Sequence, residues 1–318
     1  MSIARPPPRL AIVIPAFNER AVIGETVSQL LRLLDDLDAK GLAAKESFLL
    51  FVDDGSEDGT WEALCERKLA DGRIRGLRLS RNFGHQNALI AGLTAVVDES
   101  DVNVCIDADL QHDISLIEGF LRKHIEGHDI VYGVKNERRS DTLFKKTSAT
   151  LYYKLLRLFG VNVVYNHADF RLLSKRALVQ LLQYQEVNLF LRGIIPMLGF
   201  KSTSLHYDVK ERMAGESKYP LRKMISLAID GITSFSVVPL RMVSILGFVS
   251  VLISIVNTAL VFYDYFRHQV VPGWSTVVVS IYFVGGIQLV SLGVIGEYLG
   301  KLYFEVKARP RFIIDRRL

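Results

Sequence analysis

The sequence predicts an α/β domain with a largely parallel sheet, followed by two helices that cross a membrane. Three observations support this prediction. From residue 10 to about residue 210, short apolar runs alternate with amphipathic segments, which is typical of a sheet covered by helices. Two long apolar runs without a formal charge follow, Met242–Phe262 and Trp274–Gly296. In agreement, 49% of the 318 residues are hydrophobic, and the mean hydropathy of +0.22 is high for a soluble protein.

The alternating region divides into individual strands and helices. The expected strands are Leu10–Pro15, Phe48–Val52, Ile74–Ser80, Val102–Asp107 and Asp129–Val134, with a further short strand at Asn162–Val164. The expected helices are Ala21–Ala39, Thr60–Leu69, Asn87–Val97 and Ile114–His124. Ligands of such sheets bind beyond the carboxyl ends of the strands. Functional residues are therefore expected in the segments that follow each strand.

Each of the two apolar runs approaches or exceeds the ~20 residues that a helix needs to cross a bilayer core. A pair of buried core helices is the alternative, but two such helices would need a large domain around them, and few residues remain. Lys and Arg concentrate on the two outer flanks, whereas Arg267 is the only one in the link between the runs. By the positive-inside rule, both flanks and the first domain face the cytoplasm.

The expected organisation has four parts: a cytoplasmic α/β domain (1–218), a juxtamembrane amphipathic helix (219–240), a two-helix transmembrane domain (241–300) and a basic cytoplasmic tail (301–318). The protein is thus expected in the cytoplasmic membrane, crossing it more than once. Apolar residues at helical spacing predict that the amphipathic helix lies on the membrane surface or packs on the first domain. A homo-oligomer is a further hypothesis, because small residues in the second run allow close helix packing: Gly285, Gly286, Gly293, Gly296 and Gly300.

Charge and cysteine content exclude several classes of protein. The net charge is +5, but the sequence has no helix-turn-helix pattern, zinc-ligand spacing or aromatic platform, so nucleic acid is not expected as a partner. The basic residues gather instead in Arg138–Lys146 and around the apolar runs, where phosphates or anionic lipid headgroups are the expected partners. Two cysteines, Cys65 and Cys105, are too few for a disulfide scaffold.

The strongest chemical signal is the acidic segment that ends the expected strand Val102–Asp107. If strand geometry continues through it, the side chains of Asp107 and Asp109 point to the same face. Two carboxylates directed at one place favour a cation between them, and Gln111 offers another hard oxygen, so Mg²⁺ or Mn²⁺ is expected. A polar turn is the alternative interpretation, with Asp113 as the N-cap of the next helix.

Two other strand exits carry candidate ligand groups. Val52–Thr60 is an acidic, glycine-containing turn whose carboxylates can accept hydrogen bonds from a ribose or a base. Ile14–Glu19 follows the first strand and, taken alone, is a weaker signal.

The ordered motifs IPAFNE, VDDGSEDGT, SRNFGHQ, DADLQ and ERMAGESKYP resemble glycosyltransferase family 2, which implies a GT-A fold with a Rossmann-like mixed sheet. Within that family the chain is similar to polyprenyl-phosphate glycosyltransferases of the bactoprenol glucosyltransferase type, relatives of dolichol-phosphate mannose synthase. The resemblance runs from about Leu10 through both apolar runs. It implies an inverting transfer of a hexose from a nucleotide-sugar to a polyprenyl phosphate, for cell-envelope glycans. UDP-glucose is the favoured donor, and other sugars stay open.

The resemblance also implies roles for the matching residues. Pro15, Phe17, Glu19 and Asp54 would bind the nucleoside, and Asp107 and Asp109 the diphosphate and a Mg²⁺ or Mn²⁺ ion with Gln111. Arg212, Ser217 and Lys218 would face the phosphates of donor or acceptor, and the motif places His85 near the site. From the residues themselves, Lys135 is a further cation for the acceptor phosphate. Asp169 is a candidate base or acceptor-orienting group; alternatively, it forms a structural ion pair with Arg171 or another neighbour.

Two other functions share features with this sequence. A processive polysaccharide synthase shares the GT-A motifs but carries a Gln-x-x-Arg-Trp signature that neither Trp61 nor Trp274 matches. A catalytically silent membrane scaffold would not need both Asp107 and Asp109.

Overall fold

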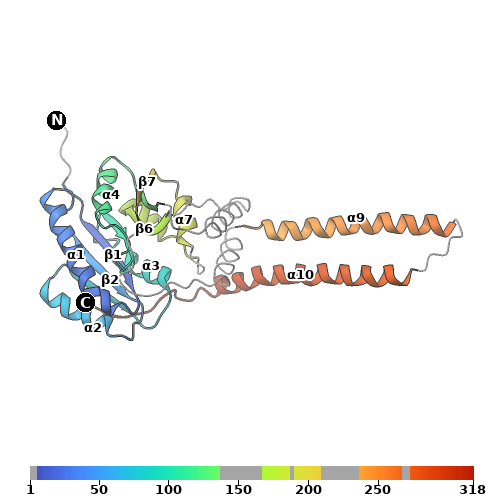
Figure 1. The fold of residues 1–318 in the computed structure, drawn as a ribbon, viewed down its shortest axis with the longest axis horizontal. Helices are drawn as coiled ribbons and strands as arrows, with labels where there is room; N and C mark the ends of the chain where they lie inside the picture. The colour runs from blue at the N-terminus through green and yellow to red at the C-terminus, as the bar shows by residue number, and fades with distance from the viewer. Residues whose placement is uncertain (1–5, 137–166, 187–189, 209–235, 267–272) are drawn as a thin grey trace. The chain divides into compact units, whose positions relative to one another are not determined.

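The computed structural model describes residues 6–136, 167–186, 190–208, 236–266 and 273–318. They belong to two units, which are described separately. The first unit contains the described residues up to 208 together with residues 309–318, and the second contains residues 236–308. Figure 1 shows the ribbon of both.

The first unit is built on an eight-stranded mixed sheet with the order β7-β5-β6-β4-β1-β2-β3-β8. The strands are β1 (Leu10–Ala16), β2 (Phe48–Asp53), β3 (Ile74–Leu79), β4 (Val102–Cys105), β5 (Ile130–Lys135), β6 (His167–Ser174), β7 (Ser202–Tyr207) and β8 (Ile314–Arg317). Strands β4, β1, β2 and β3 run parallel, whereas β6 and β8 are antiparallel to their neighbours. The chain therefore has a GT-A-like α/β fold with a mixed sheet, as predicted.

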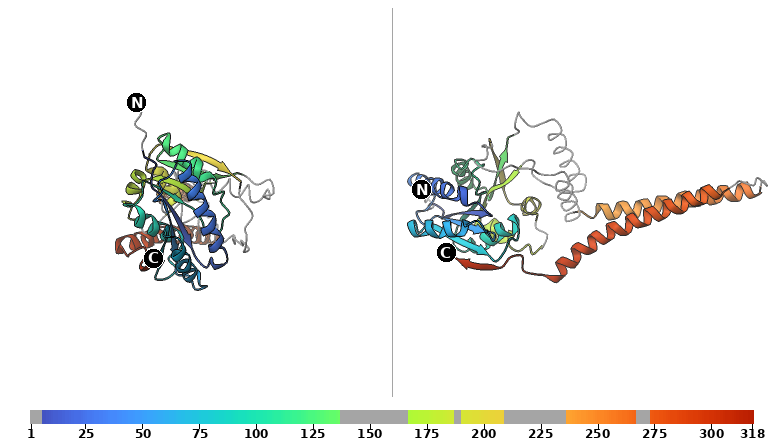
Figure 2. Two further views of the ribbon diagram at one scale, coloured as in Figure 1. Left: turned by 90° about the vertical axis from the view of Figure 1, so that its left-hand side faces the viewer. Right: turned by 60° about the horizontal axis from the view of Figure 1, so that its bottom comes forward.

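Helices cover both faces of this sheet (Figures 1 and 2). They are α1 (Arg20–Ala39), α2 (Thr60–Ala70), α3 (His85–Val96), α4 (Leu116–Ile125), α6 (Lys175–Leu181) and α7 (Leu191–Met197). Alternate β1 residues such as Ile12 belong to the core cluster shared with α1, α2 and α4. On the other face, Gly92 of α3 lies so close to β1 and β2 that an added Cβ would be 2.5 Å from Val13. Both faces of β1 are thus buried, which explains its continuous apolar sequence.

The predicted strands and helices of the first half agree with the structure within a few residues, with one consequential exception. Strand β4 ends at Cys105 and does not continue through Asp107. Strands β6, β7 and β8 were not predicted, and the expected strand Asn162–Val164 lies outside the described residues.

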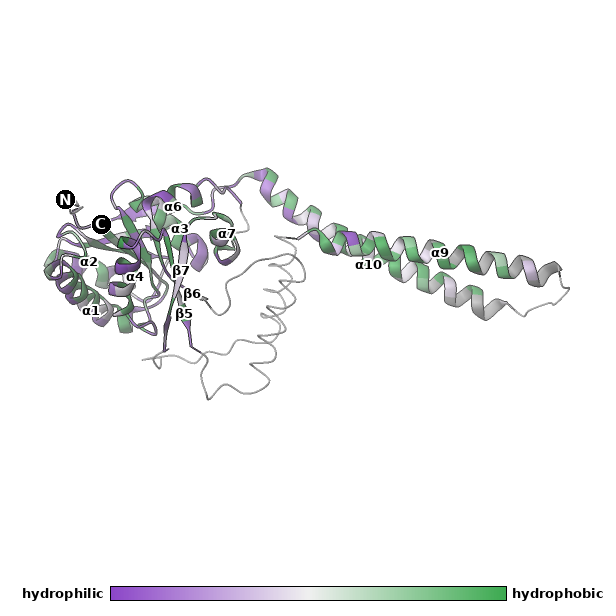
Figure 3. Ribbon diagram, turned by 90° about the horizontal axis from the view of Figure 1, so that it is seen from above, coloured by the Kyte–Doolittle hydropathy of each residue, from purple (hydrophilic) through white to green (hydrophobic). Residues whose placement is uncertain are grey.

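The second unit consists of α9 (Val238–Phe266) and α10 (Trp274–Lys307). Apolar residues dominate both helices (Figure 3), and large apolar side chains such as Phe248 and Leu289 are exposed. Among the described residues, the segment Phe283–Lys307 is long and apolar enough to cross a membrane, whereas the apolar stretch Val238–Ser250 of α9 is shorter. Two long helices are confirmed. Two membrane crossings are not established by these residues and stay a prediction. The expected juxtamembrane helix lies mostly outside the described residues.

Candidate functional site

The IPAFNE and VDDGSEDGT motifs are held together by hydrogen bonds between their loops. Asn18, in the left-handed backbone region with φ of 56°, accepts a hydrogen bond from the backbone N–H of Glu57 at 3.0 Å. Its own N–H donates to the Ser56 hydroxyl at 2.9 Å, and the N–H of Glu19 donates to the Thr60 hydroxyl at 2.9 Å. The polar residues of these motifs therefore fix the exits of β1 and β2 relative to each other.

The SRNFGHQ motif is attached to the VDDGSEDGT motif through Asp54. Both carboxylate oxygens accept backbone hydrogen bonds, from Phe83 at 2.7 Å and from Gly84 at 2.9 Å. Burial raises the pKa of Asp54, and these two hydrogen bonds oppose the rise. Gly55, with φ of 72°, allows a close approach here, because an added Cβ would lie 2.5 Å from the backbone of Arg81. The predicted contact of Asp54 with a base stays a prediction, but the carboxylate already organises a loop.

Beyond β4, a chain of hydrogen bonds holds Asp107. His112 contacts Asp107 Oδ2 through Nε2 at 2.9 Å and the Tyr207 hydroxyl through Nδ1 at 2.6 Å. The His112 ring is 1% exposed and stacks on Phe170. Burial acts to raise the pKa of Asp107, but the His112 hydrogen bond and the nearby histidines outweigh it, so the pKa is lowered. The link from His112 to Asp107 was not predicted from the sequence.

Asp107 and Asp109 act on the same neighbouring groups. Burial lowers the pKa of Lys135, and the charges of Asp107 and Asp109 both oppose that shift. The pKa of Tyr207 is raised, mainly by burial, and the same two carboxylates add to the rise. The expected reason for this convergence, strand alternation, is wrong. The chain turns after Cys105, Leu110 adopts a left-handed φ of 55°, and Asp109 accepts a hydrogen bond from the N–H of Gln111 at 3.1 Å. Turn geometry, not a strand face, sets these carboxylates.

Asp169 on β6 is surrounded by cations. Its carboxylate forms ion pairs with Arg171, which is completely buried, and with Arg192 at 3.3 Å. His85 Nε2 lies 3.5 Å from Asp169 Oδ2 and 3.6 Å from Asp107 Oδ1, so it bridges the two acids. Burial acts to raise the pKa of Asp169, yet His85, Arg171 and Arg192 hold it well below its usual value. The ion pair with Arg171 that sequence analysis gave as an alternative is present.

The SRNFGHQ motif brings two of these groups to the site. His85 begins α3 and joins Asp107 to Asp169, as described above. The next residue, Gln86, accepts a hydrogen bond from the backbone N–H of Leu191 at 3.1 Å. That bond fixes the start of α7 and hence the place of Arg192. Arg192 was not predicted from the sequence because no motif surrounds it. Gln86, which positions its helix, does lie in a motif.

The acidic residues suit a divalent cation that the substrate helps to bind. Among the described residues, no group of three or more His, Cys, Asp and Glu side chains is arranged to hold a metal ion. Mg²⁺, however, is commonly bound by one or two carboxylates together with substrate phosphates. Asp107, with a side chain 36% exposed, and the partly buried Asp109 supply hard oxygens of that kind, so the residues fit such an ion.

A cleft of about 410 Å³ lies beyond the carboxyl ends of β2 and β3. Phe17, 44% exposed, lines it together with residues 55–57 and 78–82 and with Asp315 and Arg316. Of the other expected nucleoside residues, Pro15 is buried within β1 and Glu19 precedes α1. The location agrees with the general rule for ligands of open α/β sheets.

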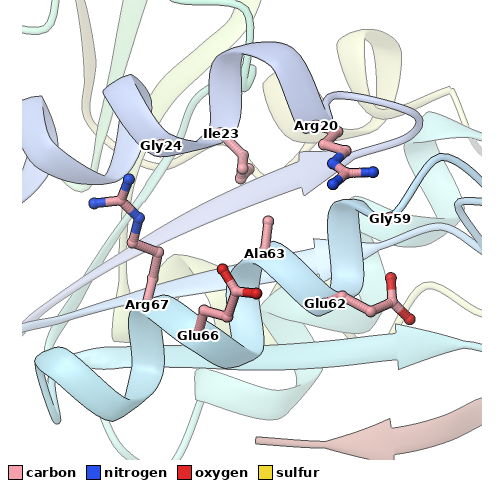
Figure 4. A pocket seen from close by; sticks show the side chains of 8 residues that line it. All are labelled: Arg20, Ile23, Gly24, Gly59, Glu62, Ala63, Glu66 and Arg67. Atoms are coloured by element: carbon pink, nitrogen blue, oxygen red, sulfur yellow. The ribbon is translucent and has the colours of Figure 1, made fainter.

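A smaller cleft of about 190 Å³ lies between α1 and α2 (Figure 4). Its charged lining residues are Arg20, Glu62, Glu66 and Arg67. It contains none of the predicted site residues, so we assign it no function. The predicted phosphate-binding residues Arg212, Ser217 and Lys218, and the cluster Arg138–Lys146, lie outside the described residues.

Comparison with known proteins finds relatives along almost the whole chain. Residues 11–182 match the family described as Glycosyl transferase family 2. The "Uncharacterized glycosyltransferase YkoT" of Bacillus subtilis (strain 168) is 49% identical, covering 97% of this chain and 91% of that protein. The "Prophage bactoprenol glucosyl transferase homolog" of Escherichia coli (strain K12) is 34% identical, covering 97% and 99%. The "Bactoprenol glucosyl transferase" of Shigella phage SfX is also 34% identical, with the same coverage. These similarities extend past the family domain into the C-terminal helices.

Proposed function

Because the chain belongs to glycosyltransferase family 2, we propose that it transfers a hexose from a nucleotide-sugar to a polyprenyl phosphate at the cytoplasmic face of a membrane. The proposed donor is UDP-glucose, and the product is a polyprenyl-phosphate sugar for cell-envelope glycans. Two relatives that match over nearly their full length carry the name bactoprenol glucosyl transferase, which supports a lipid-phosphate acceptor.

One observation carries the choice of acceptor: Asp169, the candidate base, forms ion pairs with Arg171 and Arg192. A general base works best with a pKa near the operating pH, whereas the pKa of Asp169 lies well below its usual value. A sugar hydroxyl would need such a base. A phosphate monoester, with a second pKa near ~6, is already largely dianionic at neutral pH. The acid and its cations therefore fit an anionic acceptor.

The proposed reaction needs no proton transfer. An oxygen of the acceptor phosphate attacks the anomeric carbon of the donor as the bond from that carbon to the diphosphate oxygen breaks. The nucleoside diphosphate leaves with the bonding electrons, and attack from the opposite face inverts the configuration. Charge moves from one phosphate to another, so fixed cations around both are the main requirement.

We assign these roles to particular residues. Asp107, Asp109 and Gln111 would hold the divalent cation, which when bound neutralises charge on the diphosphate. Lys135 and Arg192 would hold the acceptor phosphate against the anionic donor. Arg212, Ser217 and Lys218 are proposed to assist there, next to the membrane.

The C-terminal helices fit this acceptor because they would hold the catalytic unit near lipid headgroups. Their exposed apolar side chains are typical of surfaces that another apolar phase covers. We propose that α9 and α10 both cross the membrane and that the first unit faces the cytoplasm.

The test is transfer by the purified full-length protein in detergent. It would be incubated with undecaprenyl phosphate, a panel of nucleotide-sugars, and Mg²⁺, Mn²⁺ or EDTA, and the lipid product measured. We expect transfer from UDP-glucose that EDTA abolishes. Asp109→Ala should be inactive, whereas Asp113→Ala, which removes a carboxylate from the same segment, should stay active.

Two results would reject the proposal. One is transfer to a glycan hydroxyl with no transfer to lipid phosphate, as a polysaccharide synthase would give. The other is the absence of any transfer or nucleotide-sugar hydrolysis by folded protein, as expected of a scaffold.

A further inference from the structure

The C-terminus returns to the catalytic unit as an edge strand. After α10 ends at Lys307, residues Ile314–Arg317 form β8, which pairs antiparallel with β3. The pairing is closed at both ends, because Ser80 N–H donates to the carbonyl of Ile313 at 2.9 Å and Leu318 N–H donates to that of Gly76 at 2.8 Å. The tail predicted from its basic residues therefore includes a structured segment.

The last residue is also held by its side chain. Leu318 packs against the hydrophobic core and lies directly over Gly76, where an added Cβ would be 2.6 Å from Leu318 Cδ1. A solvated tail needs no such fit. The contact fixes the position of β8 along β3.

An irregularity in the strand pairing occurs at the cleft. Arg316 pairs with Arg78 and Ile314 with Leu79, so the register shifts and Asp315 is the extra residue. Such bulges redirect side chains and are frequent next to active sites. Arg78 lies 3.3 Å from the buried Asp53, whereas Asp315 and Arg316 are exposed, with 3.3 Å between their charged groups. Both line the cleft that contains Phe17.

This cleft and the acidic residues Asp107 and Asp109 lie at the carboxyl ends of different strands, along one edge of the sheet. The cleft is at β2 and β3, whereas Asp107 follows β4, so β2 and β3 lie two and three strands away from β4 in the sheet order. With about 4.8 Å between neighbouring strands, the two places are about 10–15 Å apart. A donor with its diphosphate at the acids would therefore extend its nucleoside toward the cleft, where Phe17 offers a stacking surface.

We propose that β8 forms one wall of the nucleoside site, with Arg316 as a donor-binding residue supplied from beyond the membrane helices. The inference rests on the proposed function for its donor class. Arg316 would donate hydrogen bonds to base carbonyls or ribose oxygens, and Asp315 would keep the guanidinium oriented. Nucleoside binding would then depend on a segment joined to α10 by six residues, 308–313.

The sequence offers a matched control one residue away. Arg317 has the same charge, lies in the same strand and is exposed, but does not line the cleft. We would purify the full-length protein with Arg316→Ala or Arg317→Ala and measure binding of UDP and GDP by calorimetry. The nucleoside diphosphate that binds to the wild type sets the next step. Binding of the corresponding nucleoside monophosphate and of inorganic pyrophosphate would then be measured for the wild type and both variants.

We expect Arg316→Ala to weaken binding of the nucleoside diphosphate and monophosphate about tenfold, the effect of losing one hydrogen bond from a charged donor. Binding of pyrophosphate should not change, and Arg317→Ala should bind all three as the wild type does. Equal effects of the two substitutions would overturn the inference in favour of a structural edge strand. So would an equal loss for pyrophosphate, or a wild type that binds neither UDP nor GDP.

Turnover separates this inference from the proposed function. Arg316→Ala should raise the KM for the nucleotide-sugar about tenfold, with kcat at saturating donor and the KM for lipid phosphate unchanged. If the wild type binds UDP but transfers nothing to lipid phosphate, the proposed function fails, and the binding comparison of the two arginine variants still decides the role of β8.

Discussion

Aspartates follow β2 and β4, but their environments differ. At the end of β2, the carboxylates of Asp53, the last residue of the strand, and Asp54 are buried. Asp53 accepts a hydrogen bond from Ser56, and Asp54 accepts two from the loop that precedes α3. After β4, Asp107 is partly exposed and is held from one side by His112, with Asp109 close by in the turn.

The difference shows how an acidic strand exit can serve structure or chemistry. A carboxylate whose oxygens accept backbone N–H groups has little capacity left for a ligand. Asp107 is different, because buried His112 holds one of its oxygens at 2.9 Å and the exposed His85 lies 3.6 Å from the other. Side chains rather than backbone N–H groups orient it, as preorganised electrostatic catalysis requires. The β2 exit therefore builds the loops, whereas the β4 exit is available for the diphosphate.

Removing the acids after β4 should give the largest effect and thus test this contrast most directly. Asp109→Ala or Asp107→Asn should lower kcat on the order of a hundredfold or more, because transition-state charge loses its stabilisation. The protein should stay folded and bound to membranes, which circular dichroism and membrane fractionation would check. Near-normal turnover of Asp109→Ala, or turnover unaffected by EDTA, would contradict the assignment.

Asp169 lies between the two cases, since it is mostly buried yet borders the site. Asp169→Asn should leave the buried Arg171 without its counter-ion, which typically destabilises by about 3 kcal/mol. Turnover should fall about tenfold as Arg192 and His85 lose their common partner. Thermal unfolding and initial rates would measure both effects.

The pH dependence tests whether Asp169 titrates during turnover. Its folded-state pKa is lowered, so its contribution to stability is present above the unfolded pKa of ~3.9 and is lost only as the pH falls through the lower folded value. Between pH 5 and 8 it stays ionised. kcat/KM for the lipid should rise through the acceptor phosphate pKa near ~6 in wild type and Asp169→Asn alike. A midpoint that moves in the variant would identify Asp169 as the base.

A substitution at the β2 exit should change mainly the stability of the protein. Asp54→Ala removes the acceptor of the N–H groups of Phe83 and Gly84, and Gly84 keeps an alternative acceptor in Asn82. We expect a loss of about 2 kcal/mol in unfolding free energy, with kcat changed by less than about threefold. Unchanged stability with a large rise in donor KM would instead support the base contact predicted from sequence.

Sequence alone predicted the alternating half of the fold well, because β1 to β5 and their helices carry clear apolar periods. It could not predict β8, because Asp315, Arg316 and Arg317 look like a solvated tail until pairing with β3 is known. The acids of the site were found because they adjoin a strand. The reason given for their convergence was wrong, since the backbone turn at Leu110 leaves no local signal. Arg192 and the link from His112 to Tyr207 depend on contacts distant in sequence.

The smallest expected effect concerns the hydroxyl of Tyr207, which contacts His112, the histidine behind Asp107. In Tyr207→Phe, His112 keeps its place in the stack with Phe170 but loses the partner that fixes its tautomer and orientation. We expect kcat to fall about threefold with both KM values unchanged, and His112→Gln to have a larger effect, about tenfold. His128→Gln, which alters a histidine that contacts the Lys123 carbonyl, should leave kcat unaffected. If the tyrosine acts through His112, Tyr207→Phe should add nothing further in a His112→Gln background, since coupled residues are not additive. Independent, multiplying effects would mean that Tyr207 supports the core only, and that Asp107 is positioned without it.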